Sequence, residues 1–210
     1  MLWEKMKNAP FIVVFVLLAI SCATSAHAKK EEIPATKFAQ EGVEASKNKD
    51  WNKAIEMFRK AAELDKKFKP NLVIAYQHRA FAAASQQKYQ DAIADLSEAL
   101  KINPQDARTY EQRAAMEMNT KDYDKALADY SQAIKFLPSE ISNYLYRGYI
   151  YELRGDKKNA MADSERALKL DPTNQEALDR KARLQVALEP RVPFTPLPQN
   201  QPATTPAGTP

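Results

Sequence analysis

Cysteine, glycine and histidine are scarce in this sequence of 210 residues, and each shortage removes a class of protein. Cys22 is the only cysteine, so no intramolecular disulfide can form and stability has to come from packing. Only 4 glycines occur, and long alternating runs of β-branched residues, which strands favour, are missing. These shortages favour an all-helical protein without covalent cross-links.

Residues suited to catalysis or metal binding are scarce as well. His27 and His78 are the only histidines, and the sequence has no H-E-x-x-H, no Cys–His set for zinc, no Gly-rich phosphate loop and no G-x-S-x-G. We therefore expect no enzyme, no catalytic residue, no metal and no cofactor. We expect His78 to be a surface or packing residue, and the alternative is a ligand or a base.

The charges are numerous but mixed. The net charge of +4 comes from 31 Lys and Arg set against 27 Asp and Glu. Proteins that bind nucleic acid usually gather basic residues into a patch or stripe. The mixture here indicates an ordinary solvated surface, so we expect no nucleic-acid partner.

Residues 1–28 have the features of a secretory signal peptide. Lys5 and Lys7 give a positive start, and an apolar run follows at 11–20. That run is shorter than the ~20 residues that a membrane-spanning helix needs. The sequence A-H-A at 26–28 places small residues where signal peptidase requires them, so we expect cleavage after Ala28.

Export of this kind predicts a bacterial protein that is periplasmic or secreted. A competing interpretation keeps the protein at a membrane, because the sequence L-A-I-S before Cys22 resembles a bacterial lipobox. Ala19 stands where a lipobox usually has leucine. The alternative is therefore a membrane-anchored lipoprotein or an assembly factor with a retained leader. We expect contact with a membrane only in that case.

A period of 34 residues organises the remainder of the chain, most clearly between Asp122 and Pro138. Equivalent residues recur at this spacing: Ala92, Ala126 and Ala160; Ala99, Ala133 and Ala167; Pro104, Pro138 and Pro172. A fixed period of this length marks a repeat array. We expect a linker at 29–34, repeats at about 35–68, 73–106, 107–140 and 141–174, a capping helix at 175–189 and a disordered proline-rich tail at 190–210.

Each repeat is predicted to consist of two helices and a turn. Small residues recur where first helices must approach their neighbours closely, at Gly42, Ala80, Ala114 and Gly148. Acidic residues that can cap the second helices precede them, at Asp50, Asp122 and Asp156. The prolines end each unit. The first repeat exceeds the period by four residues, and we assign the excess to a lengthened turn at 66–71.

These positions resemble the tetratricopeptide repeat. Its signature has an aromatic at the fourth place, here Tyr76, Tyr110 and Tyr144, with small residues at the eighth, twentieth and twenty-seventh places and proline at the thirty-second. Repeat one departs from the pattern with Lys66 in place of the proline. Repeat four departs from it with Ser164 near the twenty-fourth place, where the signature also has an aromatic. The resemblance covers 35–174. It implies a right-handed α-solenoid of antiparallel helix pairs that serves as a non-enzymatic scaffold and binds a protein or peptide on its concave face.

Three arginines each precede an aspartate by sixteen residues. The pairs are Arg79 and Asp95, Arg113 and Asp129, and Arg147 and Asp163. In a helix pair this spacing places each arginine opposite its aspartate. Repeat one lacks both partners together, with Glu41 and Met57 at these places. Three identical copies offer no distinct catalytic roles, so we expect structural ion pairs.

The resemblance also implies which residues line the concave face, namely the second, fifth, ninth and twelfth places of each first helix. In repeat one these are Thr36, Ala39, Val43 and Ser46. In the later repeats the expected partner-binding residues are Gln77, Phe81, Arg108, Glu111, Met118, Leu145 and Tyr149. An alternative for Leu145 and Tyr149 is packing under the capping helix.

Some members of this family grip the C-terminus of a chaperone with a carboxylate clamp. The matching places here hold Ala39, Val43, His78, Arg108 and Gln112. Only Arg108 carries a charge, so we do not expect that ligand.

Two segments follow the last repeat, an amphipathic one at 175–189 and a proline-rich one at 190–210. Residues 175–189 carry an apolar stripe with a polar remainder, which is typical of the capping helix of a solenoid: Ala177, Leu178, Ala182, Leu184 and Leu188. The tail at 190–210 then holds 7 of the 13 prolines, which predicts an extended, partly polyproline segment. A flexible spacer and a ligand for a groove-bearing partner both remain open for this tail.

Overall fold

The computed structural model describes residues 34–188, and within that range every regular element is helical. The expected leader, its cleavage site, Cys22 and the proline-rich tail lie outside the described residues. The helices are α2 (Ala35–Lys47), α3 (Trp51–Leu64), the 3₁₀ helix η2 (Lys66–Phe68), α4 (Lys69–Ser85), α5 (Tyr89–Ile102), α6 (Ala107–Asn119), α7 (Tyr123–Phe136), α8 (Ile141–Leu153), α9 (Lys157–Leu170) and α10 (Gln175–Leu188). Across this range, no helix is both long enough and apolar enough to span a bilayer.

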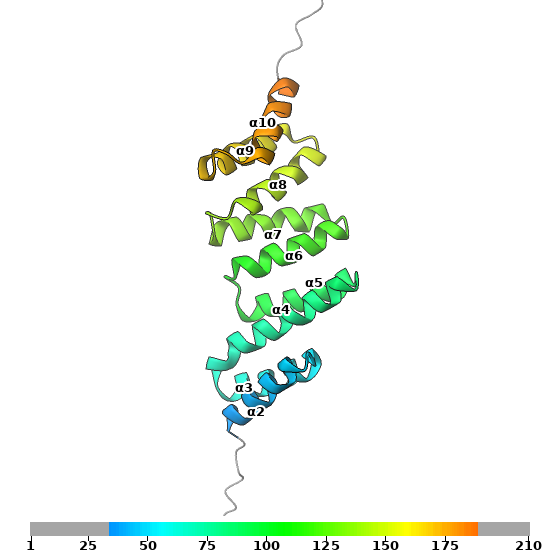
Figure 1. Ribbon diagram of the computed structural model, residues 1–210, viewed down its shortest axis with the longest axis vertical. Helices are drawn as coiled ribbons and strands as arrows, with labels where there is room; N and C mark the ends of the chain where they lie inside the picture. The colour runs from blue at the N-terminus through cyan, green and yellow to red at the C-terminus, as the bar shows by residue number, and fades with distance from the viewer. Residues whose placement is uncertain (1–33, 189–210) are drawn as a thin grey trace, which may run out of the picture. The chain divides into compact units, whose positions relative to one another are not determined.

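The helices form two compact units, and the boundary between them falls inside α4, after Arg79. In the first unit α2 and α3 pack side by side (Figure 1). Ala54 and Ala61 are completely buried there, and Phe58 is nearly so. A Cβ atom at Gly42 would lie 2.9 Å from the ring of Phe58, so this contact between α2 and α3 requires glycine.

The extra four residues of the first repeat form helix, so the prediction of a lengthened turn at 66–71 was wrong. Residues 66–68 make the 3₁₀ helix η2, and α4 then begins at Lys69, four residues before the expected repeat boundary at 73. Pro70 causes no break because it lies in the first turn of α4, where the backbone N–H has no intrahelical acceptor.

In the second unit each helix from α5 to α10 packs on the next in chain order (Figure 1). The alanines that set the period lie at these contacts, since Ala126, Ala133, Ala160 and Ala167 have no exposed surface. One core cluster joins three helices, with Ala114 from α6, Tyr130 from α7 and Ile150 from α8. The predicted all-α class, built from adjacent helix pairs, is confirmed.

Two kinds of turn separate the helices. Within each repeat, one residue after the first helix has a positive φ: 57° at Lys49, 60° at Gln87, 61° at Lys121 and 73° at Gly155. Between repeats, the residue after the second helix is extended, with φ near −130° to −140° at Asn103, Leu137 and Asp171, each of which precedes a proline. Asp65 has the same extended backbone, with φ −146°, although Lys66 follows it.

The expected caps of the second helices are present in two of three cases. The carboxylates of Asp50 and Asp156 accept the backbone N–H groups of Lys53 and Asn159. Asp122 makes no such side-chain cap, because its carboxylate accepts from the ammonium group of Lys125 in the first turn of α7.

The buried stripe of the capping helix α10 differs from the predicted one. Ala177 and Leu184 are buried as expected, but the third buried residue is Arg180, with 2% of its surface exposed. Leu178 and Leu188 are instead 40% and 50% exposed. The stripe follows the spacing i, i+3, i+7, and a charged side chain fills its centre.

Candidate functional site

The first helices of the second unit are held in place by arginines that each contact two other helices. Arg113 of α6 donates two hydrogen bonds to the carboxylate of Asp129 on α7, at 2.6 Å and 2.8 Å, and a third at 2.9 Å to the Ser97 hydroxyl on α5. The bonds to Asp129 raise the pKa of the Arg113 guanidinium. Asp129 is only 5% exposed, so its charge is neutralised inside the array.

The same arrangement recurs one repeat later. Arg147 of α8 donates to Asp163 on α9 at 2.9 Å and 2.7 Å, and to the Ser131 hydroxyl on α7 at 3.0 Å. Each arginine therefore joins the two helices of its own repeat and links them to the repeat before. The sixteen-residue spacing predicted that each arginine bonds to its aspartate. It did not predict the additional bonds to Ser97 and Ser131.

The third expected pair, Arg79 and Asp95, stays a prediction. The two residues belong to different units. Within the first unit, Arg79 donates to the Asn52 side chain at 2.7 Å.

A groove of about 480 Å³ opens on the second unit along α6. Its walls combine aromatic, apolar and polar side chains from three helices: Arg108, Glu111, Gln112, Ala115, Met116, Met118 and Asn119 of α6, Tyr130 of α7 and Tyr146 of α8. The concave positions of α6 that the sequence indicated, Arg108, Glu111 and Met118, are all present. This groove is the candidate binding site, and we call it the α6 groove.

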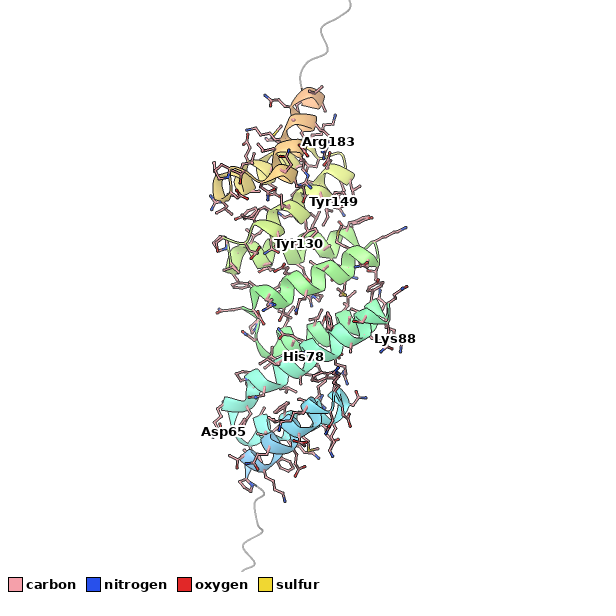
Figure 2. The ribbon with its side chains drawn as sticks, viewed as in Figure 1. Asp65, His78, Lys88, Tyr130, Tyr149 and Arg183 are labelled. Atoms are coloured by element: carbon pink, nitrogen blue, oxygen red, sulfur yellow. The ribbon has the colours of Figure 1, made fainter. Side chains whose placement is uncertain are left out.

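Two stacked tyrosines form one wall of the α6 groove. The rings of Tyr130 and Tyr146 lie 5.6 Å apart with an angle of 17° between their planes. Tyr130, labelled in Figure 2, is buried, and burial raises the pKa of its phenol. Tyr146 is half exposed, so the buried ring supports an aromatic surface that a ligand can reach.

The part of the groove formed by the start of α6 carries one positive and one negative side chain. Arg108 is exposed, whereas Glu111 is partly buried and accepts a hydrogen bond from the Ser142 hydroxyl at 3.3 Å. Burial and the neighbouring carboxylate of Glu140 raise the pKa of Glu111, and the Ser142 bond opposes this shift. The charged end therefore suits polar or backbone groups better than a ligand with many charges.

Leu145, Tyr149 and Phe81 do not line the groove. Leu145 packs against the cluster of Tyr144, Ala167 and Ala177, and Ala177 belongs to the capping helix, as the alternative interpretation anticipated. Tyr149 is 42% exposed on α8 (Figure 2), and Phe81 is 73% exposed on α4. Both are accessible apolar side chains outside the groove.

The first unit has two hollows of its own, of about 470 Å³ and 350 Å³. The predicted concave residues Thr36, Ala39, Val43 and Ser46 line them, as does Ile74 at the second place of repeat two, but Gln77 does not. His78 (Figure 2) borders the smaller hollow and stacks on Trp51 with ring centroids 4.8 Å apart, which is a packing contact.

Four of the lining residues that the sequence analysis did not predict share one position in the repeat. Gln40, His78, Gln112 and Tyr146 all occupy the sixth place of a first helix, and all four line a hollow of their own unit. Only the second, fifth, ninth and twelfth places were expected to do so. The sixth place lies four residues after the second, on the same face of the helix, so a ligand-facing surface that includes the second place reaches it as well.

One carboxyl group near the groove has an unusual environment. Glu117 of α6 is 3% exposed, and its Oε2 atom has no hydrogen-bond partner among the described residues. Burial, reinforced by the charge of Asp129, raises its pKa to about 7. The equivalent places of the earlier repeats hold Ala45 and Ala83, so this acid is peculiar to repeat three. Between residues 34 and 188 no three His, Cys, Asp or Glu side chains gather in a way that could hold a metal ion.

Comparison with known proteins agrees with this architecture. Residues 73–106, 107–138 and 141–174 match family models described as tetratricopeptide repeat. Heat shock protein STI1 of Saccharomyces cerevisiae is 40% identical over 72 residues, which are 34% of this chain and 12% of that protein. This chain therefore spans only a small part of that relative.

Solved structures give the same result for the fold. The Arabidopsis OM64 TPR domain is 28% identical, with a TM-score of 0.51 over 54% of this chain and 94% of that one. The first TPR of Spaghetti (RPAP3), bound to the HSP90 peptide SRMEEVD, is 24% identical, with a TM-score of 0.52 over 55% of this chain and 92% of that one. At such identity the second likeness concerns the fold alone.

Proposed function

This chain is a tetratricopeptide-repeat protein over residues 73–174, and from that premise we propose that it is a non-enzymatic scaffold that binds a partner peptide or helix in the α6 groove. The observation that carries the proposal is the exposed Tyr146 ring, stacked on buried Tyr130, in a groove of about 480 Å³ that Met118 also lines. A rigid aromatic side chain beside a flexible methionine is typical of surfaces that anchor apolar side chains of a partner.

The chemistry of the groove favours an extended segment with a few apolar side chains. Its apolar wall accepts those side chains, while Arg108 and Glu111 at its end offer a donor and an acceptor for backbone groups. A ligand with several charges of one sign would place a like charge beside either Arg108 or Glu111. The preferred ligand is therefore apolar and nearly neutral.

The related RPAP3 structure holds a peptide that ends in Glu-Glu-Val-Asp. This chain differs at the places where family members grip such a carboxylate, because Ala39 and Gln112 are uncharged where the clamp has lysine and arginine. An acidic C-terminus would meet Arg108 without further cationic support. The proposed partner thus belongs to a different chemical class.

We also propose that the protein works outside the cytoplasm, either released after cleavage at Ala28 or held at a membrane through Cys22. Both proposals derive from residues 1–28 alone. Mass spectrometry of the mature N-terminus distinguishes them: a start at Lys29 supports release, an acylated Cys22 supports the lipoprotein, and an intact Met1 contradicts both.

Affinity capture with paired variants tests the binding function. The whole chain and its Tyr146→Ala and Met118→Ser variants are used as bait, and proteins retained by the native chain but lost with both variants are identified. A matched control, Lys158→Ala, changes an exposed side chain of α9 that lies away from the α6 groove. Circular dichroism establishes that each variant is still helical.

The result expected is a defined partner whose retention falls at least tenfold for both groove variants and is unchanged for Lys158→Ala. A short peptide from that partner is then expected to bind the purified chain in fluorescence anisotropy. If every retained protein binds the groove variants as well as the native chain, the α6 groove is not the binding surface and the proposal is wrong.

A further inference from the structure

The end of the capping helix lies close to the end of the helix that carries Tyr146. Lys157, at the start of α9, donates to the backbone oxygen of Ala187 at 3.3 Å. Arg183 of α10, labelled in Figure 2, contacts the carboxylate of Glu152 at 3.2 Å, in the last turn of α8. The chain therefore leaves α10 at Leu188 beside the C-terminal end of α8.

The distance from that exit point to the α6 groove is short. From Leu153 at the end of α8 back to Tyr146 is about 11 Å along the helix, at 1.5 Å per residue. The spacing between packed helices adds about 8–10 Å to reach α6. A polyproline segment advances about 3.1 Å per residue, so six residues, the number from Leu188 to Phe194 in the sequence, can span about 19 Å. The tail is long enough to enter the groove.

The length and composition of the tail also match the groove. The groove follows α6 from Arg108 to Asn119, which is about 17 Å, the length of five or six residues in a polyproline helix. Residues 193–198 read P-F-T-P-L-P and carry no charge. Polyproline segments with apolar side chains bind grooves lined by aromatic residues, because their conformation is already ordered before binding. Tyr130, Tyr146 and Met118 provide such a lining.

We propose that the proline-rich tail of this chain, centred on Phe194 and Leu197, docks into its own α6 groove and competes with the partner. This inference rests on the proposed binding function of the same groove. The tail is tethered to the unit that carries the groove, and a short tether corresponds to an effective concentration in the millimolar range. Even a weak contact then keeps the groove occupied until a better ligand displaces the tail.

Photo-crosslinking on the whole chain tests the docked position. The photoreactive amino acid p-benzoylphenylalanine replaces Phe194, and a matched control places it at Ala207 near the chain end. The result expected is a set of adducts within one molecule, located on α6 or α8 and formed in constant yield across a dilution series. Tyr146→Ala and Met118→Ser are each expected to reduce that yield several-fold.

Three crosslinking results would overturn the proposal. One is the absence of adducts to α6 or α8. Another is an equal yield on these helices from position 207. The third is a set of adducts that join two molecules and disappear on dilution, because the occupant would then be a second copy of the chain.

Competition provides a second measurement. A synthetic peptide that copies residues 190–200 is titrated into the native chain and into the Phe194→Ser/Leu197→Ser variant, whose own tail can no longer dock. The peptide is expected to bind the variant at least tenfold more tightly, because the native tail already occupies the groove. Equal affinity for both chains, or no binding to either, contradicts the proposal.

The two proposals fail separately. If a partner depends on Tyr146 but no tail adduct forms, only the docking of the tail is wrong. If the tail crosslinks to α6 or α8 while no partner depends on Tyr146 or Met118, the binding function is wrong and the tail contact stands alone.

Discussion

Lys181 Nζ lies 3.5 Å from Glu165 Oε1, at the place where Arg147 donates to Ser131 one repeat earlier. The two donors are 34 residues apart, and so are the two acceptors. The Lys181 and Glu165 side chains are 40% and 50% exposed, and pairs of this kind contribute about 0–1 kcal/mol. The Lys181–Glu165 contact between α10 and α9 thus stands at the same place in the repeat as the Arg147–Ser131 bond. It is much more exposed to solvent than that bond.

Removal of the arginine that pairs with a buried aspartate is expected to destabilise the array. Arg113→Ala leaves the Asp129 carboxylate, 5% exposed, without the two hydrogen bonds that Arg113 donates to it. An uncompensated buried charge costs about 3 kcal/mol. Urea unfolding followed by circular dichroism measures the loss, with exposed Lys158→Ala as the control.

A double variant tests whether the loss of stability comes from the unpaired charge of Asp129. Arg113→Met combined with Asp129→Leu removes both charges, so it is expected to recover much of the stability that Arg113→Ala loses. A denaturation midpoint for Arg113→Ala equal to that of Lys158→Ala would contradict the assignment of Arg113 as a structural partner.

Glu117 is expected to make stability fall as the pH rises. Its pKa is about 7 in the folded chain and 4.5 is the ordinary value, so the folded state holds a proton that the unfolded state has lost between these values. The free energy of unfolding therefore decreases from about pH 4.5 to about pH 7 and is then constant with respect to this group. Besides Asp129, the groups that face Glu117 are Arg113, Asp122 and Lys125.

The variant Glu117→Gln removes this dependence. It is expected to be more stable than the native chain by about 1–3 kcal/mol above neutral pH, and the advantage is expected to vanish near pH 4. Urea titrations at several pH values measure the difference. A difference between the two proteins that does not change with pH would show that Glu117 titrates normally.

The residues with positive φ predict a pair of opposite substitutions. Lys121 has φ 61° and Gly155 has φ 73°, at equivalent places of successive repeats. Side chains disfavour this conformation by about 1–2 kcal/mol, while glycine costs more entropy in folding. Lys121→Gly is therefore expected to stabilise the chain by about 0.5 kcal/mol, and Gly155→Ala to destabilise it by about 1 kcal/mol. Thermal unfolding of both variants checks the signs, and the same sign for both would contradict this account.

The missing proline of the first repeat predicts a stabilising substitution. Asp65 has the extended backbone that the residue before a proline adopts, and Lys66 begins η2, where the backbone N–H lacks an intrahelical acceptor. Lys66→Pro is expected to stabilise the chain by about 0.4–1 kcal/mol through the entropy of the unfolded state. Lys67→Pro is a suitable control, because its N–H donates to the Asp65 side chain at 3.0 Å and its replacement is expected to destabilise.

Much of the fold could be predicted because the repeat specifies it redundantly. Ala92, Ala126 and Ala160 are completely buried at one equivalent place, so three positions gave the same evidence. The Arg–Asp pairs of repeats three and four follow from the same redundancy. In contrast, the start of α4 at Lys69 could not be obtained from the period, because the four extra residues have no counterpart in the other repeats.

Arg180 illustrates what a pattern of apolar residues cannot predict. Its burial depends on the carboxylates of Glu152 and Glu176 and on the missing side chain of Gly148, where a Cβ atom would lie 3.3 Å from the Arg180 guanidinium. None of these contacts follows from the spacing of apolar residues in α10. The groove wall at Tyr146 was missed for a related reason, since its accessibility depends on support from Tyr130 on another helix.

The exposed contact between Lys181 and Glu165 has a consequence for the order in which the array opens. Repeat arrays behave as chains of units coupled to their nearest neighbours, so local unfolding begins at the end with the weakest coupling. In the second unit we expect that end to be α10, because its contact at the arginine position is exposed, whereas α6 and α8 each hold an arginine bonded to both neighbouring helices. The bonds of Arg180 and Arg183 to Glu152 still join α10 to α8. Amide protons of α10 should accordingly exchange with solvent well before those of α6 and α8. A capping helix that opens first would uncover Ala177 and Leu145 while the rest of the unit remains folded.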